Sequence, residues 1–224
     1  MNGEAVVLEH TETKSISLII YKIIKRLFDI ICSLVGLVFI IPIAIIIKIC
    51  YMCTGDFSSI FYTQKRVGKN GKAFRLFKFR SMVKNADKKL EVYLNENKEA
   101  KKEWDKYQKL SNDPRITKVG RIIRKLSIDE VPQFINVLKG DMSMIGPRPL
   151  IIGELDAHNG DHSIYEAVKP GITGWWACNG RSDVEEYDER LKLEYYYIQH
   201  RGIKMDIKCI FKTITSVLSS KGAK

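Results

Sequence analysis

Two adjacent carboxylates, Asp129 and Glu130, are the residues whose types and spacing most directly suggest catalysis in this 224-residue chain. They stand near the start of a predicted helix that ends at Gly140, and basic residues precede them at positions 121, 124 and 125. Pro132 is compatible with a helix that begins at or near Asp129. The helix dipole and the cations would keep a carboxylate ionised there, as a nucleophile must be. A structural interpretation stays open, because Ser127 and Glu130 also fit a capping box.

Rigid loops that contain arginine predict binding of phosphate groups. Arg148 stands between two prolines in the segment 146–149, so its backbone is fixed and its guanidinium is suited to bidentate phosphate capture. A second glycine-rich loop, residues 169–181, contains Trp175 and Arg181. Its two tryptophans would stack on a base, lie at a membrane surface or pack in a core, and the residue pattern leaves all three open.

An uncharged run at residues 30–47 indicates where these groups are held. The net charge of +11 and the 45% hydrophobic content exclude a disordered chain and a polytopic transporter, and the apolar run argues against a nucleic-acid-binding protein. Pro42 predicts a kink in a membrane helix at residues 21–50, and basic residues at both ends of the run place both ends on the cytoplasmic face. Such a helix is re-entrant. A single-pass anchor and a buried core helix remain alternatives.

The other segments predict a small, helix-rich α/β domain at residues 51–224, and residues 1–20 are predicted to be flexible. Residues 73–80 alternate apolar and basic side chains, as a strand does, and follow a predicted hairpin turn. Residues 83–111 predict one or two amphipathic helices, which pack on the core or lie in the membrane interface. The five cysteines lack the spacing of a zinc site and are predicted to be free thiols of a reducing compartment.

Taken together and in order, these motifs identify a family. The chain resembles the bacterial sugar transferase family of monotopic phosphoglycosyl transferases from about Lys25 to its C-terminus. The matching motifs are Lys25-Arg-Leu-Phe-Asp29, Gln64-Lys-Arg-Val-Gly68, Phe77-Lys-Phe-Arg-Ser-Met82, Asp113-Pro-Arg-Ile-Thr117, Ser127-Ile-Asp-Glu-Val-Pro-Gln133, Gly146-Pro-Arg-Pro149 and Lys169-Pro-Gly-Ile-Thr-Gly174. The resemblance is greatest to the undecaprenyl-phosphate galactose or glucose phosphotransferase branch and covers its catalytic core only. Ile41 stands where the family often has serine, and Cys178 stands near a usual glutamine.

The resemblance implies an activity and a set of site residues. Asp129 would attack a UDP-sugar to form an aspartyl-phosphosugar with release of UMP, and a polyprenyl (undecaprenyl) phosphate would then take the sugar 1-phosphate. The resemblance also implies Mg²⁺ near Asp129 and Glu130, phosphate binding by Arg148, Lys78 and Arg124, and a substrate loop with Trp175 and Arg181.

The resemblance further implies a location and partners. The catalytic domain would lie on the cytoplasmic face of the bacterial inner membrane, in contact with phospholipid, and a homodimer fits the family. The rival hypothesis is a non-catalytic protein that binds lipid at the membrane periphery or acts as a scaffold in a glycan assembly complex. It explains the charge and the apolar run but gives no purpose to Asp129, Glu130 and Arg148.

Overall fold

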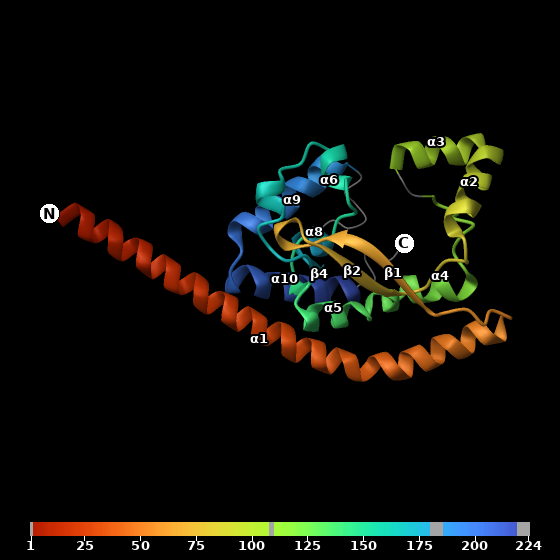
Figure 1. The fold of residues 1–224 in the computed structure, drawn as a ribbon, viewed down its shortest axis with the longest axis horizontal. Helices are drawn as coiled ribbons and strands as arrows, with labels where there is room; N and C mark the ends of the chain where they lie inside the picture. Colours follow the sequence, from red (N-terminus) through yellow and green to blue (C-terminus); the bar gives the residue numbers. More distant parts are fainter. Residues whose placement is uncertain (1, 108–109, 180–185, 219–224) are drawn as a thin grey trace.

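A single long helix runs along the underside of the molecule. The computed structural model describes residues 2–107, 110–179 and 186–218. Helix α1 (Asn2–Cys53) contains Pro42, bends part-way along its length and passes beneath the rest of the fold (Figure 1). Its segment Ser17–Cys53 is long and apolar enough to cross a membrane, and only 22% of its most apolar window is buried inside the molecule. Helix α1 extends beyond both ends of the segment 21–50, and the limits of the membrane helix remain a prediction.

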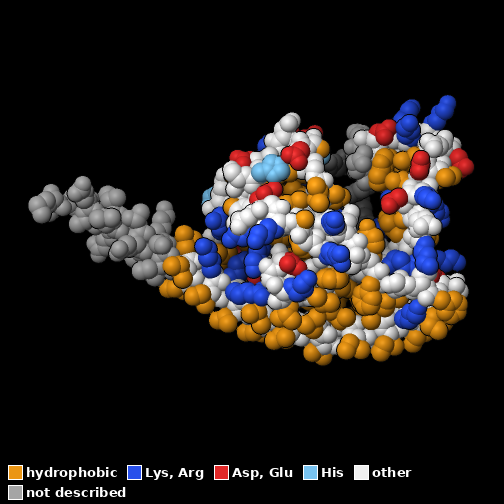
Figure 2. Space-filling model, viewed as in Figure 1, with side chains coloured by type: hydrophobic (Ala, Val, Ile, Leu, Met, Phe, Trp, Pro, Cys, Tyr) orange, Lys and Arg blue, Asp and Glu red, His pale blue; other side chains and the backbone are white. Residues whose placement is uncertain are grey.

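The underside that α1 forms is apolar. Figure 2 shows hydrophobic side chains along this edge, with lysine and arginine side chains gathered above them. Exposed apolar side chains on one side of a helix, with basic groups at their border, are typical of a surface that meets lipid. This arrangement agrees with the predicted membrane helix. Its re-entrant course remains a prediction.

Close contacts join α1 to the helix that follows the two carboxylates, α5 (Gln133–Lys139). A Cβ at Gly36 would lie 2.5 Å from the ring of Phe134, so glycine permits the close approach of the two helices. Arg26 donates hydrogen bonds to the carbonyl oxygens of Val137 and Leu138 near the C-terminal end of α5. The candidate site is thereby held directly above the apolar helix.

Two small sheets form the strand part of the fold. Strands β1 (Phe61–Val67) and β2 (Ala73–Phe79) pair antiparallel, with Phe61 opposite Phe79, and the short 3-10 helix η1 (Lys69–Gly71) joins them. The predicted strand and hairpin turn are confirmed. Strands β3 (Ser143–Ile145) and β4 (Gly171–Thr173) pair parallel in a second sheet.

Two helices confirm the helices predicted for residues 83–111, but not their predicted placement on the core or in the membrane interface. They are α2 (Ala86–Glu96) and α3 (Lys98–Tyr107), and Figure 1 shows them as an arm that projects from the main body. Helix α4 (Lys118–Lys125) follows the arm. Thr117 caps α4, because its Oγ accepts a hydrogen bond from the Gly120 N–H at 2.8 Å.

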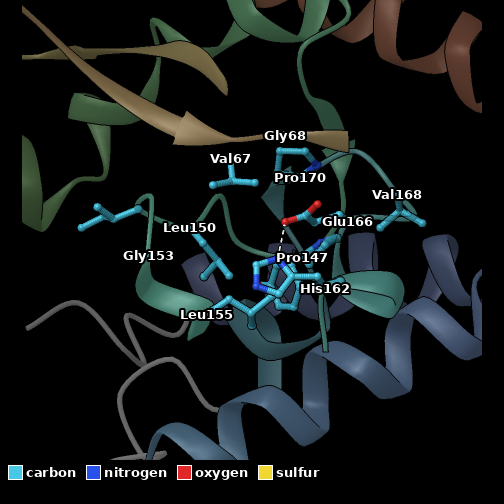
Figure 3. Close-up of a pocket in the computed structure, with 12 residues that line it drawn as sticks. Val67, Gly68, Pro147, Leu150, Gly153, Leu155, His162, Glu166, Val168 and Pro170 are labelled. Atoms are coloured by element: carbon cyan, nitrogen blue, oxygen red, sulfur yellow. Dashed lines mark hydrogen bonds and ion pairs between the residues drawn. The ribbon is translucent and has the colours of Figure 1, made fainter. Parts of the chain in front are cut away.

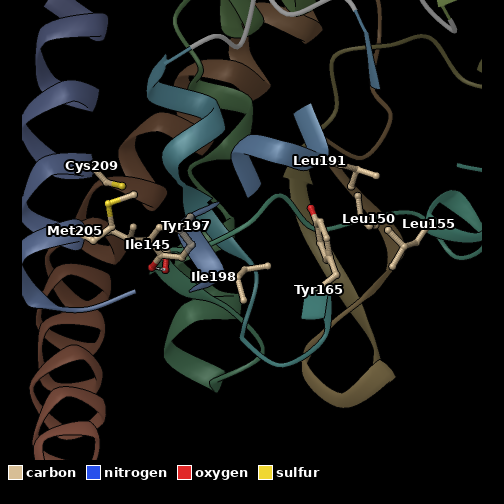
Figure 4. Packing of buried hydrophobic residues seen from close by; sticks show 9 residues of the cluster. All are labelled: Ile145, Leu150, Leu155, Tyr165, Leu191, Tyr197, Ile198, Met205 and Cys209. Carbon is tan, nitrogen blue, oxygen red and sulfur yellow. Dashed lines mark hydrogen bonds between the residues drawn. The ribbon is translucent and has the colours of Figure 1, made fainter. Parts of the chain in front are cut away.

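The remaining helices enclose the principal core. They are α6 (Glu154–Ala157), α7 (His162–Tyr165), α8 (Trp175–Asn179), α9 (Tyr187–His200) and α10 (Ile203–Leu218). Figure 4 shows their buried apolar cluster, which consists of Ile145, Leu150, Leu155, Tyr165, Leu191, Tyr197, Ile198, Met205 and Cys209. Because Ile145 and Leu150 flank the loop at residues 146–149, this core holds the predicted arginine loop in place. The helix-rich α/β class is confirmed.

Candidate active site

The capping box, the alternative interpretation of Ser127 and Glu130, is not formed. Ser127 has a left-handed backbone (φ 54°), and its side chain makes no capping hydrogen bond. Residues 128–130 form a 3-10 turn, η2 (Ile128–Glu130), and α5 begins only at Gln133. One reason is local: Pro132 has no N–H to donate to the Ile128 carbonyl, so an α-helix that started at Ser127 would lack a hydrogen bond near its beginning. The prediction of a helix that begins near Asp129 is therefore wrong by about one turn.

The turn nevertheless places both carboxylates beside Lys78, which β2 carries. Lys78 Nζ lies 3.2 Å from Glu130 Oε1 and 3.7 Å from Asp129 Oδ2. The side chains of Asp129, Glu130 and Lys78 are 14%, 21% and 27% exposed, so the group is shielded from bulk water yet open to a ligand. One ammonium between two carboxylates leaves a net negative charge, which favours a divalent cation.

A buried asparagine positions Lys78, and sequence reasoning missed it. Asn136 on α5 is fully buried; its Nδ2 donates to the Arg75 carbonyl at 2.6 Å, and its Oδ1 accepts from the Phe77 N–H at 3.0 Å. These two bonds satisfy the outer edge of β2 with a side chain instead of another strand. They fix the strand one residue before Lys78.

Arg148 is held in a rigid loop, as its two prolines predict. Its N–H donates to Glu194 Oε1 at 2.9 Å, and its carbonyl accepts from the Tyr165 hydroxyl at 2.9 Å. Burial lowers the pKa of the Arg148 guanidinium, and the charge of Arg190 lowers it further, whereas the charge of Glu130 acts to raise it. Arg148 is therefore within electrostatic range of both Glu130 and Arg190.

The other predicted site residues lie in different surroundings. Arg124 donates from Nε to Ser81 Oγ at 2.8 Å, which ties α4 to the segment after β2. Trp175 packs between the Tyr196 ring and Lys212, whose Nζ lies 4.8 Å from the indole centroid, and it also borders the principal core. This position favours the packing interpretation of Trp175. Arg181 lies outside the described residues.

A separate pocket lies next to the residue 146–149 loop. Figure 3 shows Val67, Pro147 and Leu150 lining it, with the hydrogen-bonded pair His162 and Glu166 at its border. Its lining is mostly apolar and includes neither carboxylate of the pair nor Arg148. We therefore place the candidate site at Asp129, Glu130, Lys78 and Arg148, and not in this pocket.

The donor set of the site fits magnesium. Over the described part of the chain, no group of three or more His, Cys, Asp or Glu side chains is arranged to hold a metal ion. Asp129 and Glu130 supply two carboxylates, and proteins commonly bind Mg²⁺ with one or two carboxylates, waters and the phosphates of the substrate. The pair fits a cation that a phosphorylated substrate helps to bind.

Together, the fold and the site define a helix-rich domain above an apolar helix, with a carboxylate pair, a lysine and a fixed arginine suited to phosphate chemistry. Residues 20–220 match the family model described as bacterial sugar transferase. The undecaprenyl-phosphate galactose phosphotransferase of Salmonella typhimurium is 45% identical over 90% of this chain and 42% of its own length. The exopolysaccharide production protein ExoY of Rhizobium meliloti is 39% identical over 89% of this chain and 87% of its own length.

The chain therefore belongs to the bacterial sugar transferase family, which confirms the resemblance found in its motifs. A third relative, the UDP-galactose-lipid carrier transferase of Erwinia amylovora, is 43% identical over 90% of this chain. The chain spans less than half the length of the Salmonella and Erwinia relatives.

Proposed function

We propose that the chain transfers a sugar 1-phosphate from a UDP-sugar to a polyprenyl phosphate, with release of UMP, as a membrane step of bacterial glycan assembly. The names of the relatives support a sugar-phosphate donor and an undecaprenyl-phosphate acceptor. The observation that carries the proposal is the meeting of Lys78 with both Asp129 and Glu130, because it builds a charged, shielded group, and the charge of Glu130 also acts on Arg148.

The proposed reaction has two displacements at one phosphorus. An oxygen of Asp129 attacks the sugar-bearing phosphate, the bond from that phosphorus to the bridging oxygen breaks, and UMP leaves with that oxygen. An oxygen of the polyprenyl phosphate then attacks the same phosphorus and frees the Asp129 carboxylate. The product is a polyprenyl diphosphate sugar, and no redox partner is needed.

Each neighbour of Asp129 has a separate role in this proposal. Glu130 and Asp129 would hold Mg²⁺, which would offset negative charge on the diphosphate when bound. Lys78 keeps the two carboxylates close together and adds positive charge where the phosphate must approach. Arg148 binds a phosphate oxygen, and Glu194 and Tyr165 keep its loop rigid.

The membrane position is part of the same proposal. The exposed apolar side of α1 would enter one leaflet of the inner membrane and return at Pro42, so that the domain lies on the cytoplasmic face next to phospholipid. A lipid acceptor would then reach the site without leaving its leaflet. A homodimer is compatible with this arrangement.

Release of UMP tests the function. Full-length protein in lipid nanodiscs with Mg²⁺ and undecaprenyl phosphate is mixed with a panel of UDP-sugars, and UMP is measured. We expect UMP from at least one donor, and no UMP from that donor with Asp129→Asn. Asp87→Asn, which changes an exposed aspartate on α2, is the matched control and should keep the activity. Absence of UMP with every donor would favour the lipid-binding or scaffold hypothesis.

A further inference from the structure

Most of the buried polar side-chain atoms that lack a hydrogen-bond partner lie in one region, next to Arg148. Seven such side-chain atoms occur in the described part of the chain, and six of them belong to one group of residues. These atoms are Arg66 Nε, Trp176 Nε1, Tyr187 Oη, Arg190 Nε, Arg190 Nη2 and Glu194 Oε2. Buried polar groups are nearly always paired, so six unpaired atoms in one place indicate a missing partner.

These residues contact one another and Arg148, and we call them, with Arg148, the arginine cluster. The Arg190 guanidinium lies 5.0 Å from the Trp176 ring and 4.8 Å from the Tyr187 ring, and the Arg148 guanidinium lies 5.8 Å from the same Trp176 ring. Glu194 accepts from the Arg148 N–H at 2.9 Å. Two arginines therefore face one indole ring from residues far apart in the sequence.

Glu154 connects Arg66 to the rest of the arginine cluster. Glu154 lies between two guanidiniums, with 3.2 Å from its Oε1 to Arg190 Nη1 and 3.9 Å from its Oε2 to Arg66 Nη1. Arg66 also donates to the Pro149 carbonyl at 3.1 Å, next to Arg148. Arg66 and Arg190 thus both lie close to the loop that carries Arg148.

The charge and the donors of the arginine cluster specify an anion. Three arginines face two carboxylates, Glu154 and Glu194, and burial raises the pKa of Glu194 to about 7, so that it is only partly ionised near neutral pH. Five of the six unpaired atoms belong to groups that donate hydrogen bonds. One buried water accepts too few hydrogen bonds for five donors and leaves the positive charge in place. An oxyanion satisfies both requirements.

The arginine cluster continues the candidate site. The charges of Glu130 and Arg190 both act on the Arg148 guanidinium. Arg148 is therefore close enough to Glu130 and to the unpaired donors of Arg190 to connect the two groups. A diphosphate that meets Asp129 with one phosphate would meet Arg148 and Arg190 with the other.

We infer that the arginine cluster binds the phosphate of the nucleotide that leaves, with Arg190 as its principal new ligand. This inference rests on the proposed function and assigns to Arg190, Tyr187 and Trp176 a role in binding the donor. The phosphorus attacked by Asp129 lies at the Lys78 side, and the UMP phosphate lies at the Arg190 side. The nucleotide product would accordingly bind without Asp129 and without the lipid acceptor.

Equilibrium binding of UMP to the full-length protein in nanodiscs tests the inference. Arg190→Gln should weaken UMP binding by about 10-fold or more, because hydrogen bonds to charged groups are lost. Arg190→Lys, which keeps the charge, should weaken it less. Arg201→Gln removes an exposed arginine at the end of the same helix and should bind UMP as the wild type does. Equal UMP affinity of wild type and folded Arg190→Gln would overturn the inference.

Further variants and a second ligand complete the test. If Arg190→Gln does not fold, Tyr187→Phe and Trp176→Phe are tested in its place. Each removes one unpaired donor and should weaken UMP binding by a few fold. Unchanged UMP affinity in both variants would overturn the inference. A soluble short-chain prenyl phosphate should bind equally to wild type and Arg190→Gln. Weaker binding of that ligand alone would assign the arginine cluster to the acceptor and overturn the inference. If the wild type turns over a UDP-sugar but Arg190→Gln leaves the UMP affinity unchanged, only this inference is refuted. If no donor yields UMP, the proposed function is refuted.

Discussion

Replacing Asn136 with alanine tests the link between the fold and the site. Asn136 is fully buried, and its side chain is the partner of the Arg75 carbonyl and of the Phe77 N–H on β2. Asn136→Ala leaves both backbone groups without their partner beside a side chain that is itself fully buried. Each unpaired buried group costs about 1–3 kcal/mol, so for two groups the free energy of unfolding should fall by about 2–6 kcal/mol. Because β2 also carries Lys78, UMP release should fall as well.

Denaturant unfolding in one detergent at one pH measures this change. Asn95→Ala, which alters an exposed asparagine on α2, is the matched control and should stay within about 0.5 kcal/mol of the wild type. Asn136→Asp keeps the acceptor for Phe77 but places a carboxylate oxygen where Nδ2 lies 2.6 Å from the Arg75 carbonyl, so it should be at least as destabilising. Asn136→Ala with wild-type stability would refute the positioning role.

Three other changes have defined outcomes. Lys78→Met should slow UMP release by about tenfold or more, because it loses the charge-assisted contacts to both carboxylates. Lys78→Arg keeps a positive charge and should restore part of the rate. Equal rates for the wild type and both variants would contradict the role of Lys78. Burial raises the pKa of Glu194 from 4.5 to about 7, so the folded state binds this proton more tightly than the unfolded state does. Stability should therefore fall as pH rises through this interval, by an amount on the order of 3 kcal/mol. Glu194→Gln should remove this decline, and a pH profile of melting temperature that is the same in both proteins would contradict the prediction. In cells, cysteine labelling should place Lys22→Cys and the native Cys53 on the same, cytoplasmic side of the membrane, whereas opposite sides would identify a single-pass helix.

Local signals in the sequence were sufficient for several elements. The cap at Thr117 depends on residues within one turn, and the structure contains it. The helix stop at Gly140 is also present, with the left-handed backbone (φ 88°) that glycine tolerates. The alternating pattern of residues 73–80 likewise predicted β2, because one face of the strand is buried against α5.

Where two local signals competed, the sequence alone did not decide between them. Ser127 and Glu130 have the spacing of a capping box, but Pro132 removes a hydrogen bond near the beginning of an α-helix that starts at that point, and a 3-10 turn forms instead. The outcome matters for the site, since the turn directs both Asp129 and Glu130 toward Lys78.

Contacts between distant segments could not be read from local patterns. Asn136 is an ordinary polar residue of a short helix until β2 is placed beside it. Arg66 and Arg190 carry no motif that marks them as partners, and only folding brings both to Glu154. The predicted role of Trp175 was open for the same reason, because Tyr196 and Lys212 come from later helices.

A covalent adduct on Asp129 is the most direct test of the proposed transfer. The full-length protein is incubated with Mg²⁺ and its preferred UDP-sugar without any lipid acceptor, quenched in acid and examined by intact and peptide mass spectrometry. We expect a mass increase of one sugar phosphate on the peptide that contains Asp129, lost on addition of polyprenyl phosphate and absent in Asp129→Asn. UMP release that requires the acceptor from the start, with no adduct at any time, would contradict the role of Asp129 as nucleophile.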